Sequence, residues 1–502
     1  MNNKKAMKVT RNEDFSMWYQ EVVKESELAE LAHVRGCMVI KPWGYGIWEN
    51  IQNILGDKIK ERGSENVYFP LFIPLSYISK EAKHVDGFAK EMAVVTHHRL
   101  EKDLESGQLI PSSELSEPVV VRPTSETIIG ESMSQWIKSY KDLPLKLNQW
   151  CNVVRWEMRP RVFLRTVEFL WQEGHTAHAS IKEARDFTFE MLLVYRDFVR
   201  EFLAIPVIVG TKPIYDRFPG AVETYCIEAM MQDGKSLQAG TSHYLGDNFA
   251  RAADIKFTSE NGTLEYVHTT SWGVSTRLIG GLIMTHADDD GMRVPPKIAT
   301  YQIVINTLLN SKDEELNEKI NRYAEELSKK ISSSKTFEGR QIKVKVDSRN
   351  IASSDKKWSW IKKGVPILIE IGKNELENNS VMYRLRSEDP SIKHTLLEED
   401  FVNNVESYLS DIQNTYLKEA EERLQSNVTK IDSFEELEKY FSNEKDVFFV
   451  EAPYYDSIGE DERLKEMKVT IRCILLDEMD EESECILTGK KTKKRAIFAK
   501  SY

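Results

Sequence analysis

Long apolar runs are missing from this sequence, and so is a cysteine framework. No stretch approaches the ~20 apolar residues that a membrane-spanning helix needs, and the opening MNNKKAMKVTRNEDF lacks the apolar segment of a secretory signal. The five cysteines are widely scattered, which argues against a disulfide scaffold and for a reducing compartment. These absences predict a cytoplasmic protein.

An excess of positive charge is also lacking, because 80 acidic residues against 68 basic ones give a net charge of -12. A protein that binds nucleic acid over its whole surface needs Lys and Arg facing the phosphates. Any RNA contact must therefore use a local basic patch, and the alternative is that the same residues are solvated faces. The candidates are Lys329, Lys330, Lys356, Lys357, Lys362, Lys363 and the run KKTKKR at 490–495.

The length of 502 residues is too great for one core and suggests about three domains. Segment 43–62 repeats apolar residues at helical spacing and stops at Gly63, which predicts an amphipathic helix. The NVYFPLFIP that follows is rich in aromatic residues but contains Pro70 and Pro74, which cannot donate to a central ladder. We expect an edge strand or a strand between subunits.

Two long strands, 145–157 and 163–176, are predicted on either side of the turn MRPRV. Before them we expect a polar loop over 96–117, a strand PVVVRP, and a helix over 124–141 capped by Thr124 or Ser125. Ser180-Ile-Lys-Glu183 is a capping box that opens another helix. Antiparallel strands with helices on one side favour an α+β layer over a Rossmann sheet.

A change of rhythm near VPPK (294–297) predicts a domain boundary. Beyond it, strands around a helix over 313–331 indicate a small α/β domain, and a charged helix over 397–425 leads to a third unit with its own capping box, Ser433-Phe-Glu-Glu436. The expected domains are 1–297, 298–396 and 397–502.

Residues 150–175, WCNVVRWEMRPRVFLRTVEFLWQEGH, combine the side chains that amino-acid activation needs. Adenine stacks on an aromatic or guanidinium face, a triphosphate and a carboxylate accept from forked donors, and a cationic substrate needs a carboxylate. This composition favours a site for ATP and an amino acid. The pair His175 and His178 lies in a predicted strand with no third ligand nearby, so we expect no metal site there.

The same segment resembles motif 2 of the class II aminoacyl-tRNA synthetases, with Arg155-Trp-Glu157 followed by Arg165-Thr-Val-Glu-Phe169. Its continuation, FLWQEGH, is similar to the prolyl-tRNA synthetases of the archaeal and eukaryotic-like type. Further blocks extend the likeness over nearly the whole chain. They are SENVYFPLFIP (64–74), which resembles motif 1, RPTSE (122–126), LQAGTSHYLG (237–246), and SWGVSTRLIGG (271–281), which resembles motif 3 with its arginine at Arg277.

The resemblance implies an α+β catalytic domain with the antiparallel sheet of class II synthetases, followed by an α/β anticodon-binding domain and a small α+β C-terminal domain. It implies ATP-dependent ligation of L-proline to tRNA(Pro) through a prolyl-adenylate, with release of pyrophosphate and with Mg²⁺ on the ATP. Its partners would be tRNA(Pro) and a second copy of the chain, joined through motif 1. The alternative is a synthetase-like RNA-binding or regulatory paralogue that has lost catalysis.

The family's site residues carry over onto the matching positions of this sequence. Arg155 would lie between the proline carboxylate and the α-phosphate, and Arg277 would face the γ-phosphate, as the two catalytic residues. The positions expected to bind proline are Thr124, Glu126, Arg155, Trp171, Glu173, His175 and His243. Those expected to bind ATP are Arg155, Glu157, Arg165, Phe169, Gln238, Thr241, Ser275 and Arg277.

The sequence also departs from the family at several places. Only 62 residues (176–237) separate His175 from Gln238, so we expect no inserted editing domain. Relatives often bind zinc in the third domain through four cysteines, but the turn APYYDSIGEDE has none and the second site keeps only Cys485, so we expect no structural zinc. In the anticodon-binding domain a carboxylate and an arginine of relatives are replaced, and Lys363 and Glu375 are expected to contact tRNA instead. Tyr502 matches relatives whose chain end folds back toward the catalytic domain.

Overall fold

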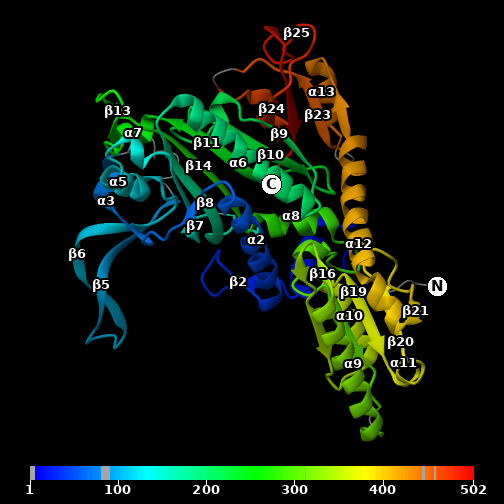
Figure 1. Cartoon of the computed structure of the whole chain (residues 1–502). Coiled ribbons are helices and arrows are strands. Elements are labelled where there is room, and N and C mark those ends of the chain that lie inside the picture. The colour runs from blue at the N-terminus through cyan, green and yellow to red at the C-terminus, as the bar shows by residue number, and fades with distance from the viewer. Residues whose placement is uncertain (1–5, 81–90, 158, 311, 444–446, 457–458) are drawn as a thin grey trace.

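The core of the molecule is an eleven-stranded sheet whose middle strands run antiparallel (Figure 1). The computed structural model describes residues 6–80, 91–157, 159–310, 312–443, 447–456 and 459–502. In spatial order the strands are β22 (Val428–Lys430), β23 (Phe449–Pro453), β27 (Arg495–Ala499), β24 (Thr470–Leu475), β9 (Val207–Thr211), β10 (Glu223–Met230), β11 (Ser236–Gly246), β14 (His268–Ser275), β8 (Glu168–His178), β7 (Leu145–Val154) and β3 (Glu65–Asn66).

Helices cover the middle of this sheet and close a large apolar core. The helix α6 (Ile181–Glu201) lies across β10, β11 and β14 and buries Phe187, Tyr195 and Phe198 (Figure 1). The helix α2 (Pro42–Lys60) packs against α6 and against α8 (Arg277–His286), and α1 (Phe15–Glu25) packs against α8 in the same apolar cluster. The helix predicted over 43–62 is therefore present, and Gly63 follows its end with a φ of +78°. The smaller elements of this region are β1 (Ala29–Leu31), β2 (Met38–Ile40), α5 (Glu126–Trp136), α7 (Asn248–Ala252), β12 (Lys256–Thr258) and β13 (Leu264–Tyr266).

A long β-hairpin stands out from the body where a polar loop was expected (Figure 1). Its strands β5 (Ala93–Lys102) and β6 (Leu109–Val121) pair along most of their length, and β4 (Phe72–Pro74) joins β6. The expectation of a loop over 96–117 was wrong. Most of the hairpin is exposed on both faces, so its residues show no apolar alternation, and only the backbone pairing makes it a strand pair.

The helix after RPTSE starts at Glu126, and Ser125 is its N-cap residue without capping it through its side chain. The Ser125 Oγ donates instead to Glu173 on β8. The second motif 2 strand starts at Glu168, five residues later than expected, because residues 161–165 form a tight turn in which Phe163 has a φ of +62°. Met158 of the predicted MRPRV turn lies outside the described residues.

A separate five-stranded sheet in the order β18-β15-β19-β20-β21 begins at Ile303. Its first three strands are parallel, and it packs against α9 (Glu314–Ser334), α10 (Ser353–Lys362) and α11 (Lys373–Asn378). This is the small α/β unit that the strand and helix rhythm predicts. The strands are β15 (Ile303–Thr307), β18 (Val344–Asp347), β19 (Ile367–Ile371), β20 (Ser380–Leu385) and β21 (His394–Leu397).

The long helix α12 (Glu398–Ser426) runs from this unit to the C-terminal unit, which includes α13 (Phe434–Phe441) (Figure 1). The C-terminal strands join the central sheet, because β24 pairs with β9 at Ile474↔Thr211 and Leu475↔Gly210. Tyr502 folds back onto the turn between β10 and β11, where its hydroxyl donates to Asp233. No helix of the described residues is long and apolar enough to cross a membrane.

The junction between β9 and β24 predicts a strict requirement for glycine at position 210. A Cβ there would lie 2.5 Å from the Ile474 carbonyl oxygen and 2.7 Å from the Cys473 Cβ. We expect Gly210→Ala to lower the free energy of unfolding by about 1–3 kcal/mol, the usual cost of overpacking.

Thermal unfolding followed by circular dichroism measures this effect. The matched control is Gly56→Ala inside α2, where an added Cβ would lie 3.7 Å from its nearest neighbour and alanine should stabilise the helix by about 0.5–1 kcal/mol. Equal melting temperatures for the two variants would contradict the close approach of the strands.

Candidate active site

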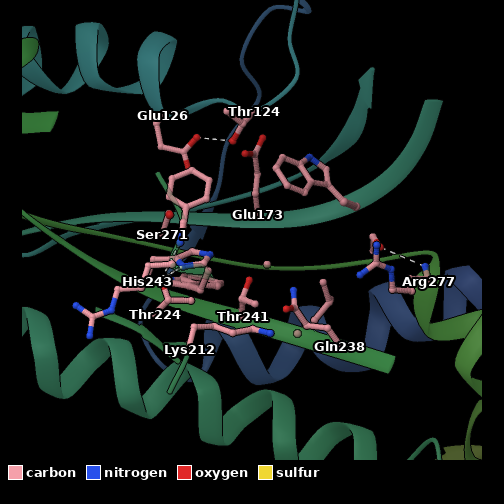
Figure 2. A pocket seen from close by; sticks show the side chains of 18 of the residues that line it. Thr124, Glu126, Glu173, Lys212, Thr224, Gln238, Thr241, His243, Ser271 and Arg277 are labelled. Carbon is pink, nitrogen blue, oxygen red and sulfur yellow. Dashed lines mark hydrogen bonds between the residues drawn. The ribbon is translucent and has the colours of Figure 1, made fainter. Parts of the chain in front are cut away.

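One cavity of about 350 Å³ opens on the face of the central sheet that α6 does not cover. It brings together most of the predicted site residues from five separate stretches of sequence (Figure 2). Those that line it are Thr124, Glu126, Arg155, Phe169, Trp171, Glu173, His175, Gln238, Thr241, His243, Ser275 and Arg277.

Strand β8 supplies four of these side chains because a strand alternates its faces. Phe169, Trp171, Glu173 and His175 are all odd-numbered and point into the cavity. The even-numbered side faces α6, where the Tyr195 hydroxyl donates to Gln172. Gly174 also belongs to that side, and a Cβ there would meet the Trp272 ring at 2.1 Å.

Strand β11 supplies Gln238, Thr241 and His243, which a regular alternation would not place on one face. The register between β10 and β11 shifts at Ile227/Glu228, so that Ala239 has no partner on β10. This bulge shifts the alternation of side chains along β11 by one residue, so that both Gln238 and Thr241 point toward the cavity.

Glu173 is the buried centre of a hydrogen-bond network at one end of the cavity. It accepts from Gln149 Nε2 at 2.9 Å and from Ser125, and its other oxygen lies 2.9 Å from His175 Nε2. Burial alone would raise its pKa, but the hydrogen bond and charge of His175, with these other donors, hold the pKa of Glu173 below its usual value. Glu173 is therefore an ionised carboxylate that fixes its neighbours.

Glu126 and His243 complete this end. Thr124 Oγ1 donates to Glu126, whose carboxylate borders the cavity at the start of α5 (Figure 2). Burial, reinforced by the charge of His175, lowers the pKa of His243 to about 3. His243 is therefore a neutral imidazole at physiological pH, and its Nδ1 lies 3.1 Å from the Thr224 hydroxyl.

Two arginines extend from this end, where Arg155 lies near Glu126 and Glu173, to the other, where Arg277 lies. Arg155 Nε donates to the Pro123 carbonyl at 3.0 Å, and its guanidinium lies 5.7 Å from the Phe169 ring centroid and 5.6 Å from that of Trp171. Arg277 starts α8, and its Nε donates to the Leu164 carbonyl at 3.2 Å. Burial and the charges of Arg155 and Arg165 lower the pKa of Arg277 to about 10, so it stays charged at neutral pH. This end suits a phosphate or carboxylate.

Four predicted residues do not line the cavity. Arg165 and Glu157 pair with each other at 2.7 Å on the segment after β7, and the arginine side chain is 60% exposed. In the small α/β unit, Lys363 Nζ lies 2.8 Å from Glu27 of the catalytic part, and Glu375 accepts from the Gly372 amide at the start of α11. Their expected contacts with ATP and tRNA remain predictions.

Sequence reasoning missed a group of cavity residues that follow β9. They are Lys212, Asp216, Arg217, Phe218, Pro219, and, from the neighbouring strands, Thr224 and Ser271. The segment KPIYDRFPG offered a signal, because charged and aromatic residues between prolines at a strand end are typical of a binding loop. The Phe218 ring lies against that of His243 in a tilted arrangement, with ring centroids 4.7 Å apart.

The two cysteines of the C-terminal unit lie in different apolar clusters. Cys473 is fully buried on β24 and contacts Cys226 of β10, while Cys485 packs in an apolar cluster with Tyr454 and Ile486. Among the described residues, no three His, Cys, Asp or Glu side chains gather as a metal ion would require. Residues 457 and 458 of the APYYDSIGEDE turn lie outside that description.

The segment that would hold an editing domain is part of the core instead. Between β8 and β11 the chain forms α6, β9 and β10, all of which take part in the central sheet or its covering layer. No inserted domain is present between the motif 2 strand and Gln238, a stretch that the structure describes in full.

Comparison with known proteins agrees with this geometry. Residues 109–286 match the tRNA synthetase class II core domain (G, H, P, S and T), residues 302–408 match the anticodon binding domain, and residues 434–502 match the prolyl-tRNA synthetase C-terminal domain.

Relatives are similar over their whole length. A proline–tRNA ligase of Protochlamydia amoebophila is 53% identical over 507 residues, covering 100% of this chain and 99% of the relative, and one of Paramagnetospirillum magneticum is 51% identical over 99% of both. A crystal structure of prolyl-tRNA synthetase from Cryptosporidium parvum, complexed with L-proline and AMP, superposes with a TM-score of 0.85 at 32% identity, covering 99% of this chain and 97% of the other. The chain therefore belongs to the prolyl-tRNA synthetases, the class II enzymes that ligate proline to tRNA.

Proposed function

We propose that this chain activates L-proline with ATP and transfers it to tRNA(Pro) within the cavity described above. A proline carboxylate oxygen attacks the α-phosphorus of ATP, the bond to the bridging oxygen breaks, and pyrophosphate leaves. A hydroxyl of the tRNA 3′ end then attacks the prolyl carbonyl, and AMP leaves. The observation that carries the proposal is that one cavity holds two carboxylates and two fixed arginines, with Arg155 close to the carboxylates and Arg277 beyond it.

The arginine end is assigned to ATP. Arg155 would contact both the proline carboxylate and the α-phosphate, and Arg277 the γ-phosphate, so that charge developing on phosphate oxygens meets fixed cations. No protein nucleophile is needed, because the reaction depends on positioning and electrostatics. Mg²⁺ would arrive on the triphosphate as part of the substrate. Phe169 offers a face for adenine, and Gln238, Thr241 and Ser275 offer hydrogen bonds nearby. Glu157 and Arg165 would contact ATP at the rim.

The carboxylate end is assigned to proline. Its secondary ammonium has two N–H donors, for which Glu126 and Thr124 are acceptors, and its ring needs an apolar wall, which Trp171 provides. Glu173 and His175 hold this wall in place through their ion pair. His243, being neutral, adds no charge that would repel the ammonium.

The tRNA would reach from this cavity to the small α/β unit. Contact between the anticodon and Lys363 or Glu375 is proposed from the family resemblance, although both side chains also hold local structure. With no editing domain between the motif 2 strand and Gln238, clearance of mischarged alanine would require another protein. We place the enzyme in the cytoplasm, where its tRNA is found.

A homodimer through motif 1 is proposed as well. The strand β4 and the segment before it expose large apolar side chains, with Tyr68 75% and Phe72 48% exposed. The adjoining hairpin exposes Leu100 and Leu109. Leu100 pairs with Pro111, and Leu109 pairs with Lys102, so both leucines lie on the same face of the hairpin. Exposed apolar side chains on β4 and on the hairpin suit contact with a second copy of the chain.

Proline-dependent exchange of pyrophosphate into ATP, measured across the full amino-acid panel, tests the proposed activity. Proline should support exchange best, and alanine should be about 10–200-fold weaker, because missing methylenes give only modest discrimination. Arg277→Met should lower kcat by about 10²–10³, the usual cost of removing a group that stabilises transition-state charge. Absence of exchange would favour the non-catalytic paralogue.

Replacing Glu126 by glutamine tests the assignment of the proline end. The amide cannot offer a charged acceptor to the ammonium, so we expect the KM for proline to rise about tenfold or more, with a smaller change in the KM for ATP. The matched control is Glu131→Gln, further along α5 and outside the cavity lining, which should behave like the wild type. Equal KM values for proline in both variants would rule out the role of Glu126.

The mass of the protein in solution tests the dimer. Light scattering after size-exclusion chromatography should give about twice the 58.1 kDa of one chain. Tyr68→Glu should shift the mass toward one chain, because a charge in an apolar interface lacks a partner. The matched control Leu264→Glu, 66% exposed on β13, should leave the dimer intact. A wild-type monomer, or an unchanged mass for Tyr68→Glu, would contradict the motif 1 interface.

A further inference from the structure

A buried carboxylate lies under the cavity, and two units of the chain share it. Glu228 on β10 is fully buried. Its oxygens lie 3.1 Å from Lys212 Nζ and 3.1–3.3 Å from Nη2 of Arg472, and Ser236 donates to it at 2.7 Å. A buried carboxylate needs cationic neighbours, because an unpaired charge is very costly to bury.

Lys212 connects this carboxylate to the active site. The residue follows β9, lines the cavity and is only 3% exposed. Figure 2 shows its side chain running beneath Thr241 toward Gln238, on the opposite side from Thr124 and Glu126. A second partner, Asp216, lies 3.1 Å from Nζ and also borders the cavity. The ammonium is therefore held in one place between two carboxylates.

Arg472 comes from the C-terminal unit. It lies on β24, two residues before Ile474, which pairs with Thr211 of β9. Lys212 is the next residue after Thr211, so the strand that carries Arg472 runs beside the residues that lead to Lys212. Arg472 Nε also donates to Glu228 at 3.2 Å, and Nη1 donates to Thr470 at 3.0 Å. The guanidinium is thus fixed by its own strand and directed at Glu228.

The charges of its neighbours explain why Glu228 stays ionised. Burial would raise the pKa of Glu228, but the charges of Lys212 and Arg472 and the Ser236 hydrogen bond keep that pKa below its usual value. Lys212, despite its own burial, has its pKa raised by Glu228. When both cations are present, the two Glu228 oxygens have enough partners, and the Lys212 ammonium can stay beside the cavity.

We propose that Arg472 is a positioning residue for amino-acid activation, which acts through Glu228 to hold the Lys212 ammonium at the floor of the cavity. Lys212 then adds a third fixed cation to the field of Arg155 and Arg277 that the reacting carboxylate and phosphates experience. This inference rests on the proposed function and deepens it: the C-terminal unit contributes to activation without contacting a substrate.

Arg472→Met tests the inference, with Arg495→Met as the matched control. Arg495 belongs to the same unit, but its ion pairs are with Asp432 and Glu451 on the far side of that unit's strands from Glu228. Proline-dependent pyrophosphate exchange should lose about tenfold in kcat in Arg472→Met, the size of effect expected for a residue that acts through a network, while Arg495→Met stays within about twofold. The KM for proline should change little, because the loss concerns charge that develops in the transition state.

Two further variants separate positioning from simple loss of stability. Arg472→Lys keeps a charge for Glu228 and should recover most of the activity. Lys212→Met should lose at least as much activity as Arg472→Met, and the double variant should lose no more than Lys212→Met alone, because both changes act on the same ammonium. The folded fraction of every variant is measured by circular dichroism at the assay temperature, and rates are expressed per folded molecule.

Several outcomes would overturn the inference. They are an Arg472→Met rate equal to that of Arg495→Met, additive losses in the double variant, or a loss that disappears once rates are expressed per folded molecule. If Arg472→Met does not fold, Arg472→Gln, which keeps an N–H donor toward Glu228, replaces it under the same criteria. Failure of the proposed function is distinct, because the wild-type chain itself would then show no proline-dependent exchange.

Discussion

Burial of ionised carboxylates in the central sheet is the constraint on which the active site depends. Glu173 and Glu228 lie on neighbouring parts of the same sheet, and each is nearly or fully inaccessible to solvent. Each must be held by several donors at once, since a single missing partner would leave a costly buried charge. The donors of Glu173 fix one end of the cavity, and those of Glu228 fix its floor. Rigidity of the site therefore follows from the cost of burying charge.

Much of the architecture around the cavity was predictable because local sequence patterns determine it. The odd positions of β8, from Phe169 to His175, form one face by strand alternation, and the family motifs identify them as site residues. The helix that follows Ser180 also agrees with the sequence pattern. These features depend on residues within a few positions of one another, which is the range over which a sequence pattern is informative.

The features that were not predictable depend on long-range pairing. The hairpin of β5 and β6 has no buried face to impose an apolar alternation, so its sequence resembles a loop. The bulge at Ala239 depends on how β10 pairs with β11. Arg472 meets Glu228 across 244 positions of sequence, and no local pattern in either strand indicates the other. The loop KPIYDRFPG gave a signal for Lys212, but the contact of Lys212 with Glu228 depends on the fold.

The strands of the C-terminal unit hold it to the rest of the chain. A small unit has only a limited core of its own, so contacts with a neighbouring unit add to its stability. Here its strands continue the central sheet through β24 and β9, and Gly210 permits the close approach. The buried pairing of Arg472 with Glu228 adds directionality, because a guanidinium donates only within a narrow range of geometries. Docking of the unit and assembly of the cavity floor are then the same event, so the unit cannot move away without exposing a charge that the catalytic sheet has buried.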